Sequence, residues 1–566
     1  MEAMPPTEAA ENPQAMPDKA PLQIDHRARM EILFAILLGL FLSALDQTIV
    51  GTAMPRILSE LQGIELYTWV VTIYLLTSTI TGPVYGKLSD QFGRKNLLMF
   101  GIFLFLLGSA LSGLSSNMVQ LIIFRGIQGL GAGALFPIAL AVIGDLFTPR
   151  ERGRYQGLFG AVFGLSAIIG PALGGYLTEH LSWHWVFFVN LPIGAVALFI
   201  IWRLLPALHT ANISRKVDYL GVAVFTAALV PILVGLTNKQ SLEWTDPWVG
   251  GLILLGLALS GVFLFIESRA AEPIVPLGLF RNRTYAVSIV ATFLASFGFF
   301  GAILYLPLWY QVVNGSTPTE SGYQLLPLLG GLILSSILSG QIVSRTGRYK
   351  WLTVGALLVL GVGTLLMTQL RADTSPPTLW LWQFITGLGV GPTFTVFTII
   401  VQNAVPWRQL GVATSNLTFF RQIGGAVGLA MAGTIFGSTF RTEAPLQVNS
   451  QLLAAGVPQA QIDQFAGQLG SAGAQLNSFA AVGDLGARIL DGLPAAARPF
   501  VEPFIHNIVA GIYEALSLAI ANSLWLGVIA AFIAAGVTVF MHEVPLRREH
   551  HAESAAVMRE APAAEA

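Results

Sequence analysis

Apolar stretches of about 20 residues recur along almost the whole chain, and they constrain its fold more than any other feature. A helix crosses the hydrocarbon of a bilayer in about 20 residues. Only 11% of the residues are charged, whereas soluble domains carry about 25%, so this chain cannot cover a globular surface with polar side chains. We therefore predict an all-α polytopic membrane protein. The fourteen expected spans lie at 31–54, 67–86, 96–114, 118–144, 154–178, 185–205, 217–236, 248–268, 284–309, 321–343, 351–370, 378–401, 411–437 and 520–541.

The distribution of basic residues predicts the orientation of the chain. With fourteen spans, 22 of the 30 Lys and Arg fall on the side of the two termini and six on the other side. Loops with many basic residues stay in the cytoplasm, so both termini are expected to be cytoplasmic. The remaining two, Arg125 and Arg421, lie inside spans. The first apolar run is too long for a cleavable signal peptide, and the polar tails 1–29 and 549–566 are expected to be disordered.

Two pairs of similar segments indicate an internal repeat. GKLSDQFGRK (86–95) is similar to GQIVSRTGRY (340–349), and FRGIQGLGAGALFP (124–137) is similar to WQFITGLGVGPTFT (382–395). Repeated halves around a central site are typical of transporters. The offsets, 254 and 258 residues, correspond to eight spans, so two helices are inserted between two six-helix halves. We predict halves at 30–205 and 271–548, with the inserted pair at 206–270.

The charged residues of this repeat are concentrated in its first half. Asp90 is matched by Ser344, and Arg125 is matched by Gln383. The first half is therefore the better candidate for ion coupling.

Several other functions are disfavoured by the sequence. The chain has no cysteine, which excludes disulfides, thiolate metal sites and cysteine nucleophiles. GPVYGKL (82–88) lacks the spacing of a phosphate-binding loop, and the net charge of −1 points to no nucleic-acid partner. We expect no enzyme activity, no catalytic residue, no metal site and no cofactor; the proton is the expected coupling ion.

Five motifs resemble those of the major facilitator superfamily, in particular its fourteen-helix drug:proton antiporter branch, and the resemblance covers nearly all of 30–545. The motifs are LDQTIVGTAMP (45–55), GKLSDQFGRK (86–95), RGIQGLGAG (125–133), GLSAIIGPALGG (164–175) and WHWVFFVNLPIG (183–194). The resemblance implies a multi-pass protein of the bacterial cytoplasmic (inner) membrane. It implies multidrug efflux, the export of hydrophobic or amphipathic compounds in exchange for protons by alternating access. Two alternatives are a lipid exporter of the same fold and a non-transporting membrane sensor or scaffold.

Asp46 and Arg125 are the first candidates for proton coupling. Both lie about 10–12 Å from the outer ends of their expected spans, at 1.5 Å per residue. Each charge is costly alone in the membrane, and pairing offsets part of that cost. A buried carboxylate next to a cation can take up and release protons as their separation changes. The alternative is a static ion pair that only joins the first and fourth spans.

The GKLSDQFGRK motif is a candidate cytoplasmic gate. Asp90 can lie near a helix N-terminus, where a negative charge is favoured, or pair with Arg94. Gly86 and Gly93 allow close packing and a turn. The alternative is that its basic residues only fix the orientation of the chain.

The fifth-span motif contains small residues that let helices approach closely. These are Gly164, Gly170, Gly174 and Gly175, and Pro171 permits a bend. A tight seam here would prevent proton leak between the halves. The alternative is ordinary helix packing.

A substrate cavity is expected to be apolar with a few polar groups. The candidates to line it are Gln47, Gln128, Phe297, Phe300, Trp309, Asn416 and Phe420. Arg421, near the middle of the thirteenth span, could contact a substrate headgroup or Asp46, or it could bind backbone carbonyls at a glycine-rich break.

The segment 438–519, before the last span, is expected on the extracytoplasmic side as short amphipathic helices, with the last helix extended outward. Three roles are open for it: capping the exit, lying on the outer leaflet, or contacting an extracytoplasmic partner. A partly ordered spacer is the alternative. The amphipathic character expected for this segment, together with Arg421, is what suggests the lipid exporter as an alternative.

Overall fold

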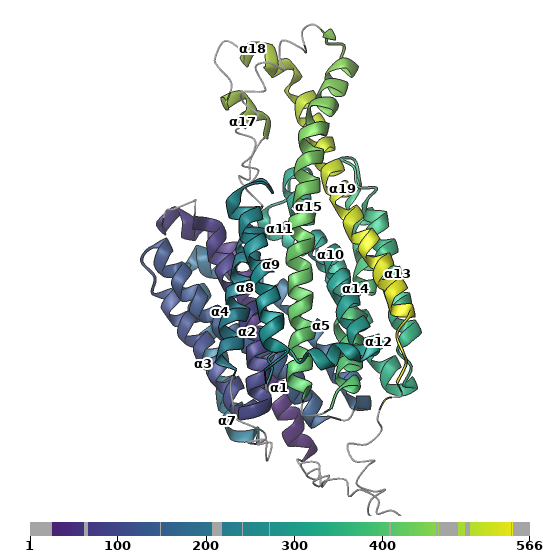
Figure 1. Cartoon of the computed structure of the whole chain (residues 1–566). Helices are drawn as coiled ribbons and strands as arrows, with labels where there is room; N and C mark the ends of the chain where they lie inside the picture. Colours follow the sequence, from purple (N-terminus) through teal and green to yellow (C-terminus); the bar gives the residue numbers. More distant parts are fainter. Residues whose placement is uncertain are drawn as a thin grey trace, which may run out of the picture.

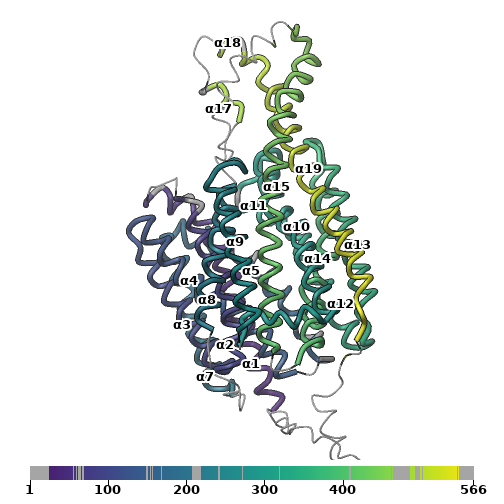
Figure 2. Tube along the Cα trace, viewed as in Figure 1, coloured from purple at the N-terminus to yellow at the C-terminus, as the bar shows by residue number. Residues whose placement is uncertain are grey.

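The protein is a long helical bundle with a projection at one end, as a computed structural model shows (Figures 1 and 2). The structure describes residues 25–61, 66–147, 149–206, 218–239, 242–270, 272–406, 409–459, 462, 485–492, 498–544 and 546. Helix α1 begins and α19 ends at the lower end of the bundle in Figure 1, which we call the termini end. Helices α17 and α18 lie in the projection at the opposite end. The expected tails fall largely outside the described residues, and α1 begins at His26 rather than at 30.

The first half of the chain forms six spans. Its helices are α1 (His26–Leu61), α2 (Tyr67–Phe92), α3 (Arg94–Gly113), α4 (Met118–Leu146), α5 (Pro149–His180), α6 (Trp185–Phe188) and α7 (Asn190–Leu204). The short α6 and α7 together make the sixth span. Gly93, with φ 96°, forms the sharp turn between α2 and α3, a backbone conformation that glycine adopts without steric cost. The side chain of Asn117 caps α4 by accepting a hydrogen bond from the Gln120 N–H.

The inserted pair and the second half follow. Their elements are α8 (Tyr219–Asn238), η2 (Pro247–Gly251), α9 (Leu252–Glu267), η3 (Leu277–Arg281), α10 (Arg283–Val312), α11 (Pro318–Tyr323), α12 (Leu326–Thr346), α13 (Lys350–Met367), α14 (Pro376–Ala404), α15 (Leu410–Ala454), α17 (Leu485–Gly492), α18 (Arg498–Val501), η5 (Glu502–Phe504) and α19 (Ile505–Val539). Asp218 caps α8 and Asn282 caps α10. Thr317 and Glu320 form a capping box at α11.

Thirteen helices in the described residues are long and apolar enough to cross a membrane. The fourteenth expected span, 67–86, is α2. This helix has 26 residues and packs against α4 and α15, but it contains five threonines and is not among the thirteen. The predicted multi-pass helical fold is therefore confirmed.

The two halves meet mainly along two helix pairs. Helix α2 packs against α15, and α5 packs against α12. The inserted α8 lies on the first of these seams, where Phe225 contacts Phe419 and Phe263 with ring centroids 5.5 and 5.2 Å apart.

The segment expected as an outer loop, 438–519, is helical at both ends. Helix α15 continues to Ala454, and α19 begins at Ile505, so both helices extend beyond the bundle into the projection (Figure 1). The expected outward extension of the last helix is therefore confirmed, and α15 extends in the same way, which was not expected. Apolar side chains stabilise the projection in a small core of their own, formed by Leu452, Val457, Ile462, Leu485, Ile489, Val501, Ile508 and Ile512.

Candidate functional site

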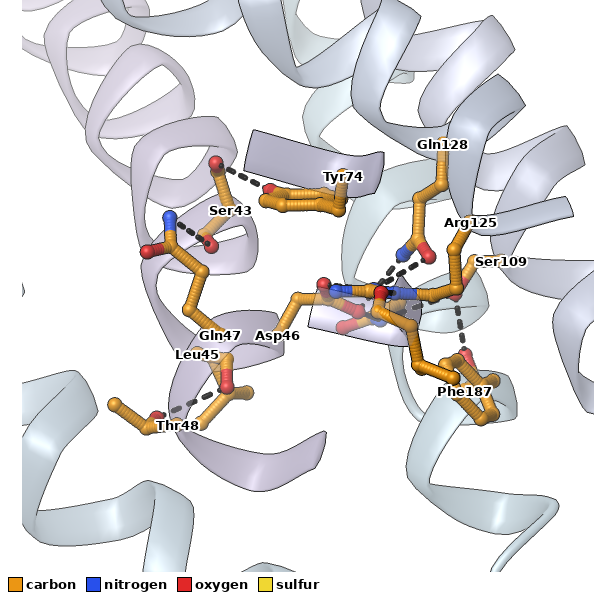
Figure 3. Close-up of polar contacts among 12 residues, drawn as sticks. Ser43, Leu45, Asp46, Gln47, Thr48, Tyr74, Ser109, Arg125, Gln128 and Phe187 are labelled. Atoms are coloured by element: carbon orange, nitrogen blue, oxygen red, sulfur yellow. Dashed lines mark hydrogen bonds and ion pairs between the residues drawn. The ribbon is translucent and has the colours of Figure 1, made fainter. Parts of the chain in front are cut away.

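A cluster of buried polar side chains surrounds Asp46 in the first half (Figure 3). Helix α1 supplies Asp46, α4 supplies Arg125 and Gln128 one turn apart, and the first residue of α7 is Asn190. Arg125 Nη1 forms an ion pair with Asp46 Oδ2. Gln128 Nε2 donates to Asp46 Oδ1 at 2.8 Å, and Asn190 Nδ2 donates to the same oxygen at 3.2 Å. The carboxylate thus joins three helices.

This ion pair is closed off from solvent. Asp46 is 0% exposed and Arg125 is 1% exposed. The Tyr74 ring lies over the guanidinium, with its centroid 4.3 Å from Arg125 Cζ, and Arg125 Nε donates to the Val70 carbonyl at 3.4 Å. Removing one partner of such a pair leaves an uncompensated buried charge, which costs about 3–5 kcal/mol.

The charge of Asp46 affects how strongly α1 and α4 attract each other. The Asp46 carboxylate contacts donors of Arg125, Gln128 and Asn190. Protonation removes the negative charge and leaves Arg125 without its counter-ion. The attraction between α1 and α4 then falls, so proton occupancy can be linked to helix movement.

Asn190, Ser109 and Tyr74 belong to this cluster but were not among the predicted site residues. Asn190 Nδ2 also donates to Ser109 Oγ at 3.0 Å, and Ser109 Oγ donates to the Phe187 carbonyl at 2.9 Å. Asn190 lies in the WHWVFFVNLPIG motif, and an amide within an apolar segment was the available signal.

Replacing Asn190 with alanine is expected to destabilise this cluster. The change removes the hydrogen bonds to Asp46 and Ser109, and a lost hydrogen bond to a charged group costs about 1.5–3 kcal/mol. Thermal unfolding in detergent, followed by tryptophan fluorescence, measures the effect. Asn96→Ala, at an exposed position of α3, is the control. Equal melting temperatures for the two variants would contradict the importance of this contact.

The predicted gate residues join the two halves at the termini end. Asp90 accepts hydrogen bonds from the Gly411 and Val412 backbone N–H groups at 3.1 and 2.9 Å. These groups begin α15, so the carboxylate lies at a helix N-terminus. Asp90 also forms an ion pair with Arg94, whose Nε lies 2.9 Å from Asp145 Oδ2. A helix N-terminus beside Asp90 was expected, but the sequence did not identify it as that of α15, and Asp145 was missed as a partner of Arg94.

Gly86 and Gly411 allow the close approach at this gate. A Cβ atom at Gly86 would lie 2.9 Å from the Gly411 carbonyl oxygen and overlap Ser415. Nearby, Gln402 Nε2 of α14 donates to the Leu140 carbonyl of α4 at 3.1 Å. The halves therefore touch through α2, α4, α14 and α15 at the termini end.

The small residues of α5 pack against two different helices. A Cβ at Gly170 or Gly174 would overlap Thr48 or Thr52 of α1, whereas one at Gly164 would overlap Ile333 of α12. Pro171 is buried near Gly322 of α11. A Cβ at Gly175 would meet nothing within 4 Å, so this glycine is not required for close packing.

Two predicted cavity residues, Trp309 and Asn416, are buried inside the second half. Trp309 is 1% exposed, and its Nε1 donates to Ser517 Oγ of α19 at 2.9 Å. Asn416 is buried, and its Nδ2 donates to the Tyr285 hydroxyl at 3.3 Å. The Trp309 indole N–H and Asn416 Nδ2 thus have partners within the protein, whereas Asn416 Oδ1 has none among the described residues.

The remaining predicted cavity residues fall into separate environments. Gln128 is part of the Asp46 cluster, whereas Gln47 is exposed and its Nε2 lies 3.5 Å from the Ser43 carbonyl. Arg421 is buried beside α14. The phenylalanines pack on neighbours, Phe297 against Gly428, Phe300 against Gly425, and Phe420 against Phe280 and Phe419.

Comparison with known proteins identifies the family. The sequence profile of the Major Facilitator Superfamily matches residues 36–429. The chain is 36% identical over 521 residues to the "Multidrug transporter protein MdtP" of Bacillus subtilis, covering 92% of this chain and 94% of that one. It is 34% identical over 511 residues to "Multidrug resistance protein 3" of the same organism, covering 90% and 94%.

A solved structure shares the fold at low sequence identity. It is described as the human organic anion transporter MFSD10 (TETRAN). It matches with a TM-score of 0.54 and 16% identity, over 72% of this chain and 94% of that chain. The chain belongs to the Major Facilitator Superfamily.

Proposed function

We propose that this protein is a proton-coupled antiporter that exports hydrophobic or amphipathic compounds by alternating access. It would lie in the cytoplasmic membrane of a bacterium, with both termini inside. The observation that carries the proposal is the Asp46 carboxylate, which is fully buried against Arg125 and held by donors from α4 and α7. An ionisable residue within a membrane span is a functional candidate by default. The names of the two Bacillus relatives support a drug-like cargo.

In this proposal, the contacts between the halves at the termini end form the closed cytoplasmic gate. The halves touch at the termini end through Asp90 and α15, and through Gln402 and Leu140. With the termini inside, this contact closes the cytoplasmic end. A proton arriving from outside would neutralise Asp46 and free Arg125. The first half would then rearrange, the cytoplasmic gate would part, and the proton would leave inward as substrate binds.

Packing between the inserted helices and the halves favours a small cargo over a lipid. A lipid needs an opening between helices toward a leaflet. Phe225 of α8 packs on Phe419 of α15 over the α2–α15 seam, and Lys87 Nζ of α2 lies 2.7 Å from Glu272 Oε2 of the segment after α9. These contacts cover one of the two seams at which a lipid could enter.

Reconstituted vesicles test the proposal. Purified protein is placed in liposomes with an acidic interior and trapped pyranine as the pH reporter, and amphipathic dyes are added outside. We expect dye accumulation that a protonophore abolishes, together with faster alkalinisation of the interior when a transported dye is present. Dye movement at the same rate with and without the pH difference would overturn proton coupling.

A further inference from the structure

Arg421 is a buried cation that lacks a counter-ion in the described part of the chain. The side chain is 5% exposed. Its Nη2 donates to the Thr393 carbonyl at 3.2 Å, and its Cζ lies 4.2 Å from the centroid of the Phe394 ring. Its Nε has no hydrogen-bond partner among the described residues. Arg125 is also buried, but it forms an ion pair with Asp46. Of the two arginines inside spans, only Arg125 therefore has an acidic partner among the described residues.

The internal repeat shows what Arg421 replaces. The offset of 258 residues that relates α4 to α14 pairs Phe136 with Phe394. The same offset relates α5 to α15, where it pairs Gly170 with Gly428 and Phe163 with Arg421. Phe163 and Phe136 contact each other with ring centroids 5.9 Å apart, and the Arg421 guanidinium lies over the Phe394 ring. A guanidinium in the second half therefore takes the place of a phenyl group in the first.

These four positions face the interior of the bundle. Helices α4 and α14 have the largest buried shares among the thirteen apolar helices. Phe394 is the only partly exposed side chain among residues 389–403, and Phe136 is the only one among residues 131–144. Both rings therefore keep some exposed surface on helices that other helices surround.

We propose that Arg421 and Phe394 form a subsite for the oxyanion of an amphipathic substrate, namely a carboxylate, sulfonate or phosphate attached to a hydrophobic body. This inference rests on the proposed export function and names the substrate class for it. A guanidinium binds carboxylate and phosphate groups through two parallel hydrogen bonds, and Nε with one Nη forms such a fork. The aromatic rings of Phe136 and Phe163 would contact the hydrophobic body.

Energetics favour the same assignment. An unpaired buried charge is costly, and binding a substrate anion would supply the missing counter-ion. A neutral compound of the same shape would not, so the site would prefer the anion. A charge-assisted hydrogen bond contributes about 1.5–3 kcal/mol, so the preference for the anion should be at least about tenfold.

Binding of a matched pair of probes to the full chain in maltoside detergent tests this subsite. The probes are 1-pyrenebutyrate and the neutral 1-pyrenebutanol, followed by fluorescence anisotropy and corrected for partition into empty micelles. We expect the wild type to bind the carboxylate at least about tenfold more tightly than the alcohol. Arg421→Gln should bind the two equally, and Arg421→Lys should keep part of the preference. Arg441→Gln, which removes a guanidinium from the exposed pair with Glu243, is the control for net charge and should behave as the wild type.

The outcomes separate this inference from the proposed function. Binding is measured without a proton gradient, so a failure of proton coupling leaves the anion preference intact. Equal binding of the two probes by the wild type, or an unchanged preference in Arg421→Gln with a wild-type melting temperature, would overturn the subsite. Lysophosphatidate serves as a competitor. Arg421-dependent displacement of pyrenebutyrate at lower concentration would support the subsite and identify a lipid headgroup as the source of the anion.

Discussion

Asp46→Asn is expected to lower proton-driven dye accumulation in vesicles by roughly a hundredfold or more, because the group that binds the proton is gone. Asparagine has nearly the same size and keeps an oxygen that can accept from Gln128 and Asn190, so the packing around residue 46 is preserved. Initial rates of accumulation in the acidic-interior vesicles give the measurement. Downhill movement of the same dye in the absence of a pH difference should persist, since the path for substrate is unchanged.

A double variant separates the coupling role from a purely structural ion pair. Asp46→Asn alone leaves Arg125 buried without its counter-ion, which costs about 3–5 kcal/mol, so the melting temperature should fall. Adding Arg125→Gln removes the stranded charge and should restore most of the stability. If the pair only joins α1 and α4, transport should recover together with the melting temperature. We expect stability to recover while gradient-driven accumulation stays lost.

The charged part of the site followed from the sequence because ionised groups in hydrocarbon have few acceptable environments. Asp46 and Arg125 lie at matched depth in their spans, and the structure places them in contact. Asp90 was expected at a helix N-terminus or beside Arg94, and the structure places it at both. Because an isolated charge in a membrane is costly, the positions of the charged residues in the sequence predict which of them pair.

Neutral polar residues were harder to place. Asn190 and Asn416 are both amides within apolar segments, yet one donates to Asp46 and the other to the Tyr285 hydroxyl. An amide is satisfied by any nearby donor or acceptor, so the sequence did not distinguish these environments. The indole N–H of Trp309 likewise donates to Ser517 Oγ inside the second half, a contact that the sequence did not indicate.

The outward extension of the last helix was expected, whereas that of α15 was missed. Hydropathy marks where a helix enters and leaves the hydrocarbon, but it carries no signal for a helix that continues into water. Helix α15 therefore extends past the expected boundary at 437 to Ala454, and α19 begins at Ile505, well before 520. Their apolar contacts with each other and with α17, which include Leu452, Ile489 and Ile512, stabilise these extensions.

The gate between the halves is sensitive to a single added carbon atom. At Gly86 a Cβ would lie 2.5 Å from the Ser415 Cβ and 2.9 Å from the Gly411 carbonyl oxygen. Both atoms belong to α15, so the overlap exists only when the termini end is closed. Within α2 itself, alanine is a better helix former than glycine, and the folding of the first half should not suffer.

Gly86→Ala is therefore expected to open the termini end and stop export without unfolding the protein. Overpacking of this kind costs about 1–3 kcal/mol, which shifts an equilibrium between two states about 5- to 150-fold. The chain has no cysteine, so Val412→Cys, at a buried position in the first turn of α15, introduces a single thiol. Its rate of labelling by a water-soluble maleimide should rise by that factor in Gly86→Ala.

Gly82→Ala, one turn earlier on α2, is the matched control, because its Cβ would approach only the Gly133 carbonyl oxygen at 3.9 Å. Equal labelling rates in the two variants would show that the contact between Gly86 and α15 does not hold the gate closed.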